Sequence, residues 1–205
     1  MKRSLLFLGT VLFLSSCITV SSKNEKAFST AANLEDAKTN DIGIDTTSEQ
    51  GLFHMASFDE DVATRKLGVS KINNQANLFH IASFNDDAEV RKIAVAKMDN
   101  QANLFHIASF DDDGAVRKIA VGKMENQANL FHIANFDGDV RVRKIAAGKM
   151  DNQANLFHIA CFDGNAEVRK IAVGKINNRA NLNHIIAFEK ESEVRQLALN
   201  QLNRN

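Results

Sequence analysis

One phrase of 26 residues, written six times along the chain, constrains its fold more than any other feature. Histidines, phenylalanines and arginines each recur at this interval, the histidines being His54, His80, His106, His132, His158 and His184. A fixed period of this length is typical of stacked-repeat proteins, in which each unit packs mainly on its neighbours. The pattern therefore predicts one elongated array over residues 52 to about 203.

Each repeat contains two stretches with helical spacing of apolar residues. In the second repeat, Leu78, Ile81, Ala82 and Phe84 predict a helix over 75–84 that buries these four side chains and exposes His80 and Ser83. Val90, Ile93, Ala94 and Met98 form the buried stripe of a second helix over about 87–98.

Acidic and asparagine residues separate the two helices and the successive repeats. Asp86 with Glu89 predicts a capping-box-like pair. Asn100 fits either a left-handed residue after one helix or the cap of the next.

The phrase resembles HEAT-type repeats, most clearly in the run DDDGAVRKIA at residues 111–120. Its short period also resembles the leucine-rich repeat variant family. These resemblances imply an all-α fold, a right-handed α-solenoid of six 26-residue two-helix repeats, and binding to other macromolecules. The cysteines of the iron–sulfur module sometimes found with the variant family are missing here, so we expect no cofactor.

The N-terminus has the order of a secretion signal. Lys2 and Arg3 precede an apolar run over 5–14 that is too short to span a membrane. The run ends in Leu14-Ser15-Ser16-Cys17, which resembles a bacterial lipoprotein lipobox and implies lipidation of Cys17 after cleavage. The alternative is an ordinary signal peptide with an incidental cysteine.

We therefore expect a signal peptide over 1–16, a lipidated and flexible polar tether over 17–50, and the repeat domain over 51–205. The resemblance places the protein in the bacterial cell envelope, facing the periplasm or the surface. Ile18 after the cysteine favours the outer membrane. The membrane would be contacted through the lipid anchor only.

The regular spacing of the arginines along the chain predicts a structural ladder, in which arginines join one repeat to the next. Arg91 projects into the apolar arc of its helix, where a charge needs a partner. The turn residue that follows each recurring phenylalanine, such as Phe84, is nearly always an acceptor. We expect guanidinium groups to bond turn oxygens between repeats, the arginines being Arg65, Arg91, Arg117, Arg143, Arg169 and Arg195 and the acceptors including Asp59, Asp111, Asp137 and Asp163.

A row of lysines is the candidate binding surface. We expect it on the exposed side of the second helices, lining a groove for an acidic protein segment or another anionic polymer. The row comprises Lys66, Lys92, Lys118, Lys144 and Lys170. The alternative is a solvated face. Small residues beside it, including Gly122, Gly148 and Gly174, suggest close approach by a helix or a partner.

The sequence gives little support for metal binding, catalysis or nucleic-acid binding. Successive histidines should lie too far apart to share a metal, the acidic triplets lack the ligand spacing of calcium loops, and no catalytic grouping is visible. With 25 basic and 25 acidic residues, the chain offers no charge excess for nucleic acid.

The sequence thus predicts a lipid-anchored scaffold or protein-binding module that acts through an extended solenoid surface. A HEAT-like accessory enzyme of the lyase type and a passive surface spacer or antigen are the alternatives.

Overall fold

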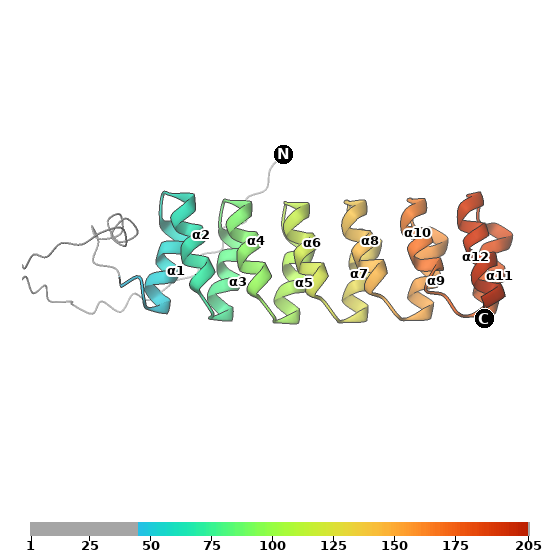
Figure 1. The fold of residues 1–205 in the computed structure, drawn as a ribbon, viewed down its shortest axis with the longest axis horizontal. Coiled ribbons are helices and arrows are strands. Elements are labelled where there is room, and N and C mark those ends of the chain that lie inside the picture. Colours follow the sequence, from blue (N-terminus) through green and yellow to red (C-terminus); the bar gives the residue numbers. More distant parts are fainter. Residues whose placement is uncertain (1–44, 205) are drawn as a thin grey trace, which may run out of the picture. The chain divides into compact units, whose positions relative to one another are not determined.

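The computed structural model describes residues 45–204, and in this range the chain forms helices without strands. Figure 1 shows the helices as successive pairs set side by side along one row. The first helices of the pairs are α1 (Glu49–Phe58), α3 (Gln75–Phe84), α5 (Gln101–Phe110), α7 (Gln127–Phe136), α9 (Gln153–Phe162) and α11 (Arg179–Phe188). The second helices are α2 (Val62–Lys71), α4 (Ala88–Lys97), α6 (Gly114–Lys123), α8 (Val140–Lys149), α10 (Ala166–Val173) and α12 (Ser192–Arg204). The all-α solenoid of two-helix repeats is confirmed.

Short polar side chains set where the helices begin. Asn74 Oδ1 accepts the backbone N–H groups of Ala76 and Asn77, at 3.0 and 3.1 Å, and caps α3. Asp87 caps α4 in the same way. The predicted pair of Asp86 and Glu89 is wrong, because Asp87 takes the cap and leaves Asp86 free to bond elsewhere. Asn100 caps α5, with φ in the ordinary negative range.

The core runs along the row without interruption. In the second repeat Leu78, Ile81, Val90, Ala94 and Met98 are almost fully buried, and the equivalent positions of the other repeats continue the same cluster. Helices of about ten residues are marginal in water by themselves. Packing against the neighbouring pair supplies the burial that each pair lacks, so the stability of a repeat depends on its neighbours.

The two sides of the row pack differently. Successive second helices, such as α4 and α6, contact each other extensively, whereas successive first helices, such as α3 and α5, barely touch. The row is therefore tight along its second helices. Along the first helices the backbones of successive repeats lie farther apart, so contact between them depends on side chains.

Two further sets of hydrogen bonds join neighbouring repeats. Gln101 Nε2 donates to the carbonyl of Lys123 at 3.2 Å, and Gln101 Oε1 accepts the N–H of Glu125 at 2.8 Å. Lys149 Nζ donates to the carbonyl of Gly122 at 2.6 Å, so a lysine of one repeat caps the second helix of the repeat before it. Both bonds recur along the array.

The predicted close approach of a neighbouring helix is absent at Gly122, one of the small positions beside the lysine row. A Cβ added to Gly122 would meet no atom within 4 Å. No described helix approaches it, and what lies beside it is the lysine that bonds its carbonyl. A small side chain there keeps that carbonyl accessible to Lys149.

Candidate interaction surface

The recurring arginines join each repeat to the next through buried ion pairs. Arg117 Nε and Nη2 donate to the two carboxylate oxygens of Asp137 at 2.8 and 3.1 Å, while its Nη1 donates to the backbone carbonyl of Asp111 at 2.8 Å. The Asp137 side chain is only 4% exposed. The same arrangement joins Arg91 to Asp111, Arg143 to Asp163 and Arg169 to Glu189.

The two ends of the ladder differ from its middle. Arg65 meets Asn85 in place of a carboxylate and bonds the exposed Asp86 instead, which leaves its buried Nε without a partner. Arg195 lies in the last of the described repeats, and it donates to the carbonyls of Glu189 and Lys190. Asp59 has no preceding arginine in the described residues. Its carbonyl accepts from Arg65, and its carboxylate accepts the N–H of Asp61.

The charges of the ladder are satisfied inside the chain. The hydrogen bond to Asp137 raises the pKa of Arg117 above its ordinary value, and each middle arginine behaves alike. Burial is the largest single influence on the pKa of Glu189 and raises it, but the hydrogen bonds from Arg169 and from the backbone N–H of Glu191, together with the charge of Arg169, outweigh burial and the pKa ends lowered. Groups this well paired hold repeats together and offer little to a ligand.

The lysine row does not form the exposed basic surface that the sequence suggested. All five side chains are half-buried rather than exposed: Lys66, Lys92, Lys118, Lys144 and Lys170. Lys92 pairs with Glu89 at 2.6 Å, and Lys170 pairs with Glu167 and with Glu193 of the next repeat.

The positive charges of the other lysines are offset by carboxylates at the start of the second helix in the following repeat. The pKa of Asp139 is lowered to about 2, first by the hydrogen bond from Arg141 and to a smaller extent by Lys118. The pKa of Asp87 is lowered mainly by the N–H of Val90, with a further contribution from Lys66. Basic and acidic groups alternate along this face, which weakens its fit to an anionic polymer.

The histidines lie on the exposed side of the first helices, where each one from His80 to His184 contacts two phenylalanines and His54 contacts Phe58. His106 stands 5.4 Å from Phe79 of the preceding repeat, ring centre to ring centre, with the rings edge to face. It stands 5.1 Å from Phe110 of its own helix. The pattern holds from His80 to His184. Within residues 45–204, no three His, Cys, Asp or Glu side chains gather to hold a metal ion.

The phenylalanines that end the first helices are exposed, and the prediction that Phe84 is buried is wrong. Their exposed fractions lie between 64% and 75%, for Phe58, Phe84, Phe110, Phe136, Phe162 and Phe188. The buried positions of α3 end with Ile81 and Ala82, and Phe84, the last residue of the helix, lies on its exposed side.

Three exposed positions on each first helix line up at intervals of four residues. On α3 they are Ala76, His80 and Phe84, and on every other first helix the equivalent positions are exposed as well. Residues four apart share one face of a helix. We call this surface the aromatic strip, and it consists of residues 50, 54 and 58 with their equivalents in the five later repeats.

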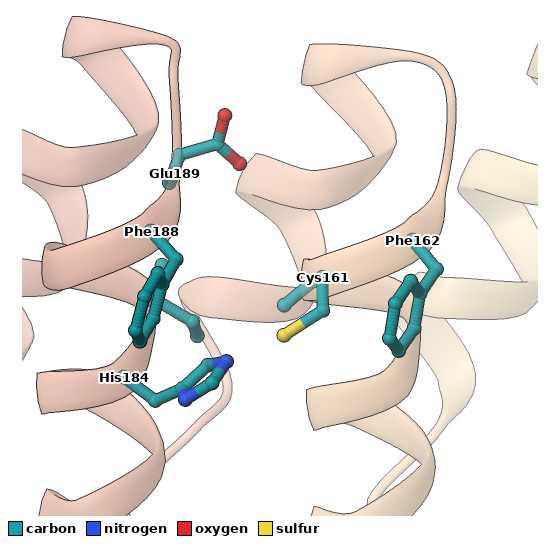
Figure 2. Close-up of a pocket in the computed structure, with 7 residues that line it drawn as sticks. Cys161, Phe162, His184, Phe188 and Glu189 are labelled. Atoms are coloured by element: carbon teal, nitrogen blue, oxygen red, sulfur yellow. The ribbon is translucent and has the colours of Figure 1, made fainter.

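A groove separates two neighbouring phenylalanines at each end of the strip. Figure 2 shows the last one, where Phe162 on α9 and Phe188 on α11 stand apart with Cys161 between them and His184 beside it. The cavity is about 160 Å³ in volume. A smaller one of about 90 Å³ lies between Phe58 and Phe84. Burial raises the pKa of the Cys161 thiol, which disfavours the reactive thiolate.

The aromatic strip was missed at the level of sequence because Phe84 completes an apolar arc on a helical projection. One signal was available. Ser83, predicted to be exposed, is half-buried, with its Oγ out of contact with solvent. Phe84 directly follows Ser83 on the helix. A buried face that includes Ser83 therefore places Phe84 on the exposed side.

Two predictions lie largely outside the described residues: the signal peptide over 1–16 with lipidation of Cys17, and most of the tether over 17–50. The first helix begins at Glu49, inside the predicted tether. Across residues 45–204, none of the helices is both long and apolar enough to cross a bilayer. Comparison with known protein families, curated proteins and solved structures finds no match to this chain.

Proposed function

We propose that this protein is a lipid-anchored scaffold of the bacterial cell envelope, which binds other macromolecules through the aromatic strip. The observation that carries the proposal is the row of six phenylalanines, each at least 64% exposed. Large contiguous apolar patches on a soluble surface mark sites of interaction. Here the patch is continuous because every repeat contributes the same side chains to it.

The composition of the strip supports contact with a macromolecule. The helices α3, α5, α7 and α9 carry no Asp, Glu, Lys or Arg anywhere in their length. Aromatic groups are enriched and charged groups depleted at the centres of protein interfaces. A ligand that runs along the strip would meet histidine and phenylalanine at every step, and the lysine row would lie on different helices.

The N-terminal sequence supports the location. The basic residues, the short apolar run and Cys17 stand in the order of a lipoprotein signal. A lipid on Cys17 would hold the array near the membrane surface, with the intervening residues as the connection. If alanine at Cys17 leaves the protein as firmly bound to membranes as the parent, this part of the proposal fails.

The binding surface can be tested with the full chain, tagged at its C-terminus and cross-linked in intact cells before purification. One variant replaces Phe84, Phe110, Phe136 and Phe162 with alanine. A second places glutamate at the five positions of the lysine row. A control replaces the exposed Leu67 and Leu199, which lie on second helices, with alanine.

We expect the parent, the lysine-row variant and the leucine control to retain the same cross-linked products, and the phenylalanine variant to lose them. Retention of all products by the phenylalanine variant contradicts the assignment of the strip. Loss only in the lysine-row variant would return the binding surface to the second helices.

A further inference from the structure

We propose that the partner of the aromatic strip is a second copy of the same chain, packed strip to strip in antiparallel order. This inference rests on the proposed role of the strip as the contact surface, and it names the partner. It draws on the shape, the area and the charge of the strip.

The strip is complementary in shape to itself. Exposed rings recur along the first helices at the spacing of the repeat, and a groove lies between the first two rings and between the last two. A second copy has the same spacing by construction, so its rings fall opposite the grooves when the two rows are offset by half a repeat. The cavity between Phe162 and Phe188 is about 160 Å³. Cavities of roughly 150 Å³ are known to take up benzene, which is the size of one phenyl ring.

The area of the strip suits a stable pair. A phenylalanine buries about 150–250 Å² when it is covered, so the exposed parts of six rings amount to roughly 600–1,000 Å². A specific interface of standard size buries about 800 Å² on each partner. The rings alone reach this size, and the exposed histidines add to it.

The charge distribution of the strip permits contact between two copies and favours one relative direction of their rows. Two copies of a charged face would repel each other, whereas α3, α5, α7 and α9 carry no Asp, Glu, Lys or Arg. The charges on the first helices are confined to the ends of the row: Glu49 starts α1, and Arg179 starts α11. Both side chains are exposed. Glu49 Oε1 accepts the N–H of Asn73 and Arg179 Nη1 donates to the carbonyl of Leu202, so both charges are held at the two ends of the row. An antiparallel pair brings the Glu49 end of each copy toward the Arg179 end of the other.

The test uses two differently tagged full chains co-expressed in the same cells, both with Cys161→Ser. One carries Gln50→Cys and the other Ala180→Cys, at exposed strip positions on the first and last repeats. A thiol-specific cross-linker is added to intact membranes. We expect a product that contains both tags. The Cys161→Ser chain without an added cysteine controls for reaction at Cys17.

Two further pairs of chains establish that the strip makes the contact. Adding Phe110→Ala and Phe136→Ala to both copies should lower the cross-linked fraction roughly tenfold or more, since the rings nearest the centre of the interface are lost. Adding Leu67→Ala and Leu199→Ala should leave it unchanged. Because the six phenylalanines are mostly exposed, their truncation keeps the chain folded, which circular dichroism of the purified variants can verify.

Three outcomes overturn the proposal, and they differ in what they say of the strip. Cross-links only between identical positions would show a parallel pair. Absence of the mixed product, with other envelope proteins still captured through the phenylalanines, would keep the binding function and reject the second copy. Phenylalanine-dependent binding of the chain to vesicles of phosphatidylethanolamine and phosphatidylglycerol, without the mixed product, would assign the strip to a lipid surface.

Discussion

The arginine ladder and the aromatic strip are equally regular in sequence, yet they differ in what their side chains contact. Arg117 fills its hydrogen bonds inside the chain, against an Asp137 that is 4% exposed. Phe110, which lies only a few residues before Arg117, turns 74% of its surface to solvent. Regular recurrence therefore shows only that a residue type is compatible with every repeat, and it does not show whether the side chain is buried or exposed. Burial and pairing separate the residues that build the array from those that it presents.

Substitution in the middle of the ladder should have the largest effect. Arg117→Ala leaves the buried carboxylate of Asp137 without its cation, so we expect the free energy of unfolding to fall by about 3–5 kcal/mol. The midpoint of denaturant unfolding measures it.

Arg65→Ala is the matched control, because its partner Asp86 is 84% exposed and stays hydrated. We expect it to lower the midpoint far less. Equal losses from the two substitutions would show that the ladder does not owe its strength to burial of the carboxylate.

Acid should weaken the array through the carboxylates that cap its second helices. The pKa of Asp139 is lowered from 3.8 to about 2 by Arg141, and the pKa values of Asp87 and Asp113 are lowered mainly by the backbone N–H groups that they cap. A group whose pKa is lowered by folding stabilises the fold above its unfolded pKa, and this contribution is lost as the pH falls through the folded value. We expect the melting temperature to hold above about pH 4 and to drop toward about pH 2.

Asp139→Asn separates the charge from the cap, because asparagine caps the first helices well. The variant should melt with a shallower dependence on pH between 4 and 2 than the parent. An unchanged slope would mean that Asp139 does not contribute to acid sensitivity.

Repair of the one weak junction should give a smaller gain. Asn85 occupies the carboxylate position opposite Arg65, where the other interior repeats have aspartate or glutamate. Asn85→Asp supplies an acceptor for the unpartnered Arg65 Nε and loses the bond from Asn85 Nδ2 to the carbonyl of Ala56. We expect a net stabilisation of about 1 kcal/mol, measured by denaturant midpoint. A destabilised variant would indicate that the bond to Ala56 matters more than the ion pair.

Removal of a ring from the strip should have the smallest effect on stability. Phe136→Ala truncates a side chain that is 75% exposed, so we expect the free energy of unfolding to change by no more than about 0.5 kcal/mol. Melting of dilute, detergent-extracted chain measures the effect without association. A loss of stability close to that of Arg117→Ala would contradict the distinction between the arginine ladder and the aromatic strip.

The period predicted the architecture well because each short helix repeats the same buried residues. The bounds of α3 and the inter-repeat position of the arginines follow directly from spacing and from the cost of an unpaired charge. The exposure of Phe84 did not follow, because a projection of one helix contains no information on where the neighbouring helix lies. The pairing of Lys170 with Glu193 was equally hidden, since the two residues meet only after the repeats have stacked.

The bonds made by Gln101, Lys149 and Arg117 all reach one repeat and no further. Twenty-six residues could therefore be inserted or removed in the middle of the row, and every junction would be rebuilt unchanged. Chains with different numbers of repeats should fold equally well. Each repeat gained would lengthen the row and add one exposed ring, so that copy number sets both the reach of the molecule and the strength of its contacts.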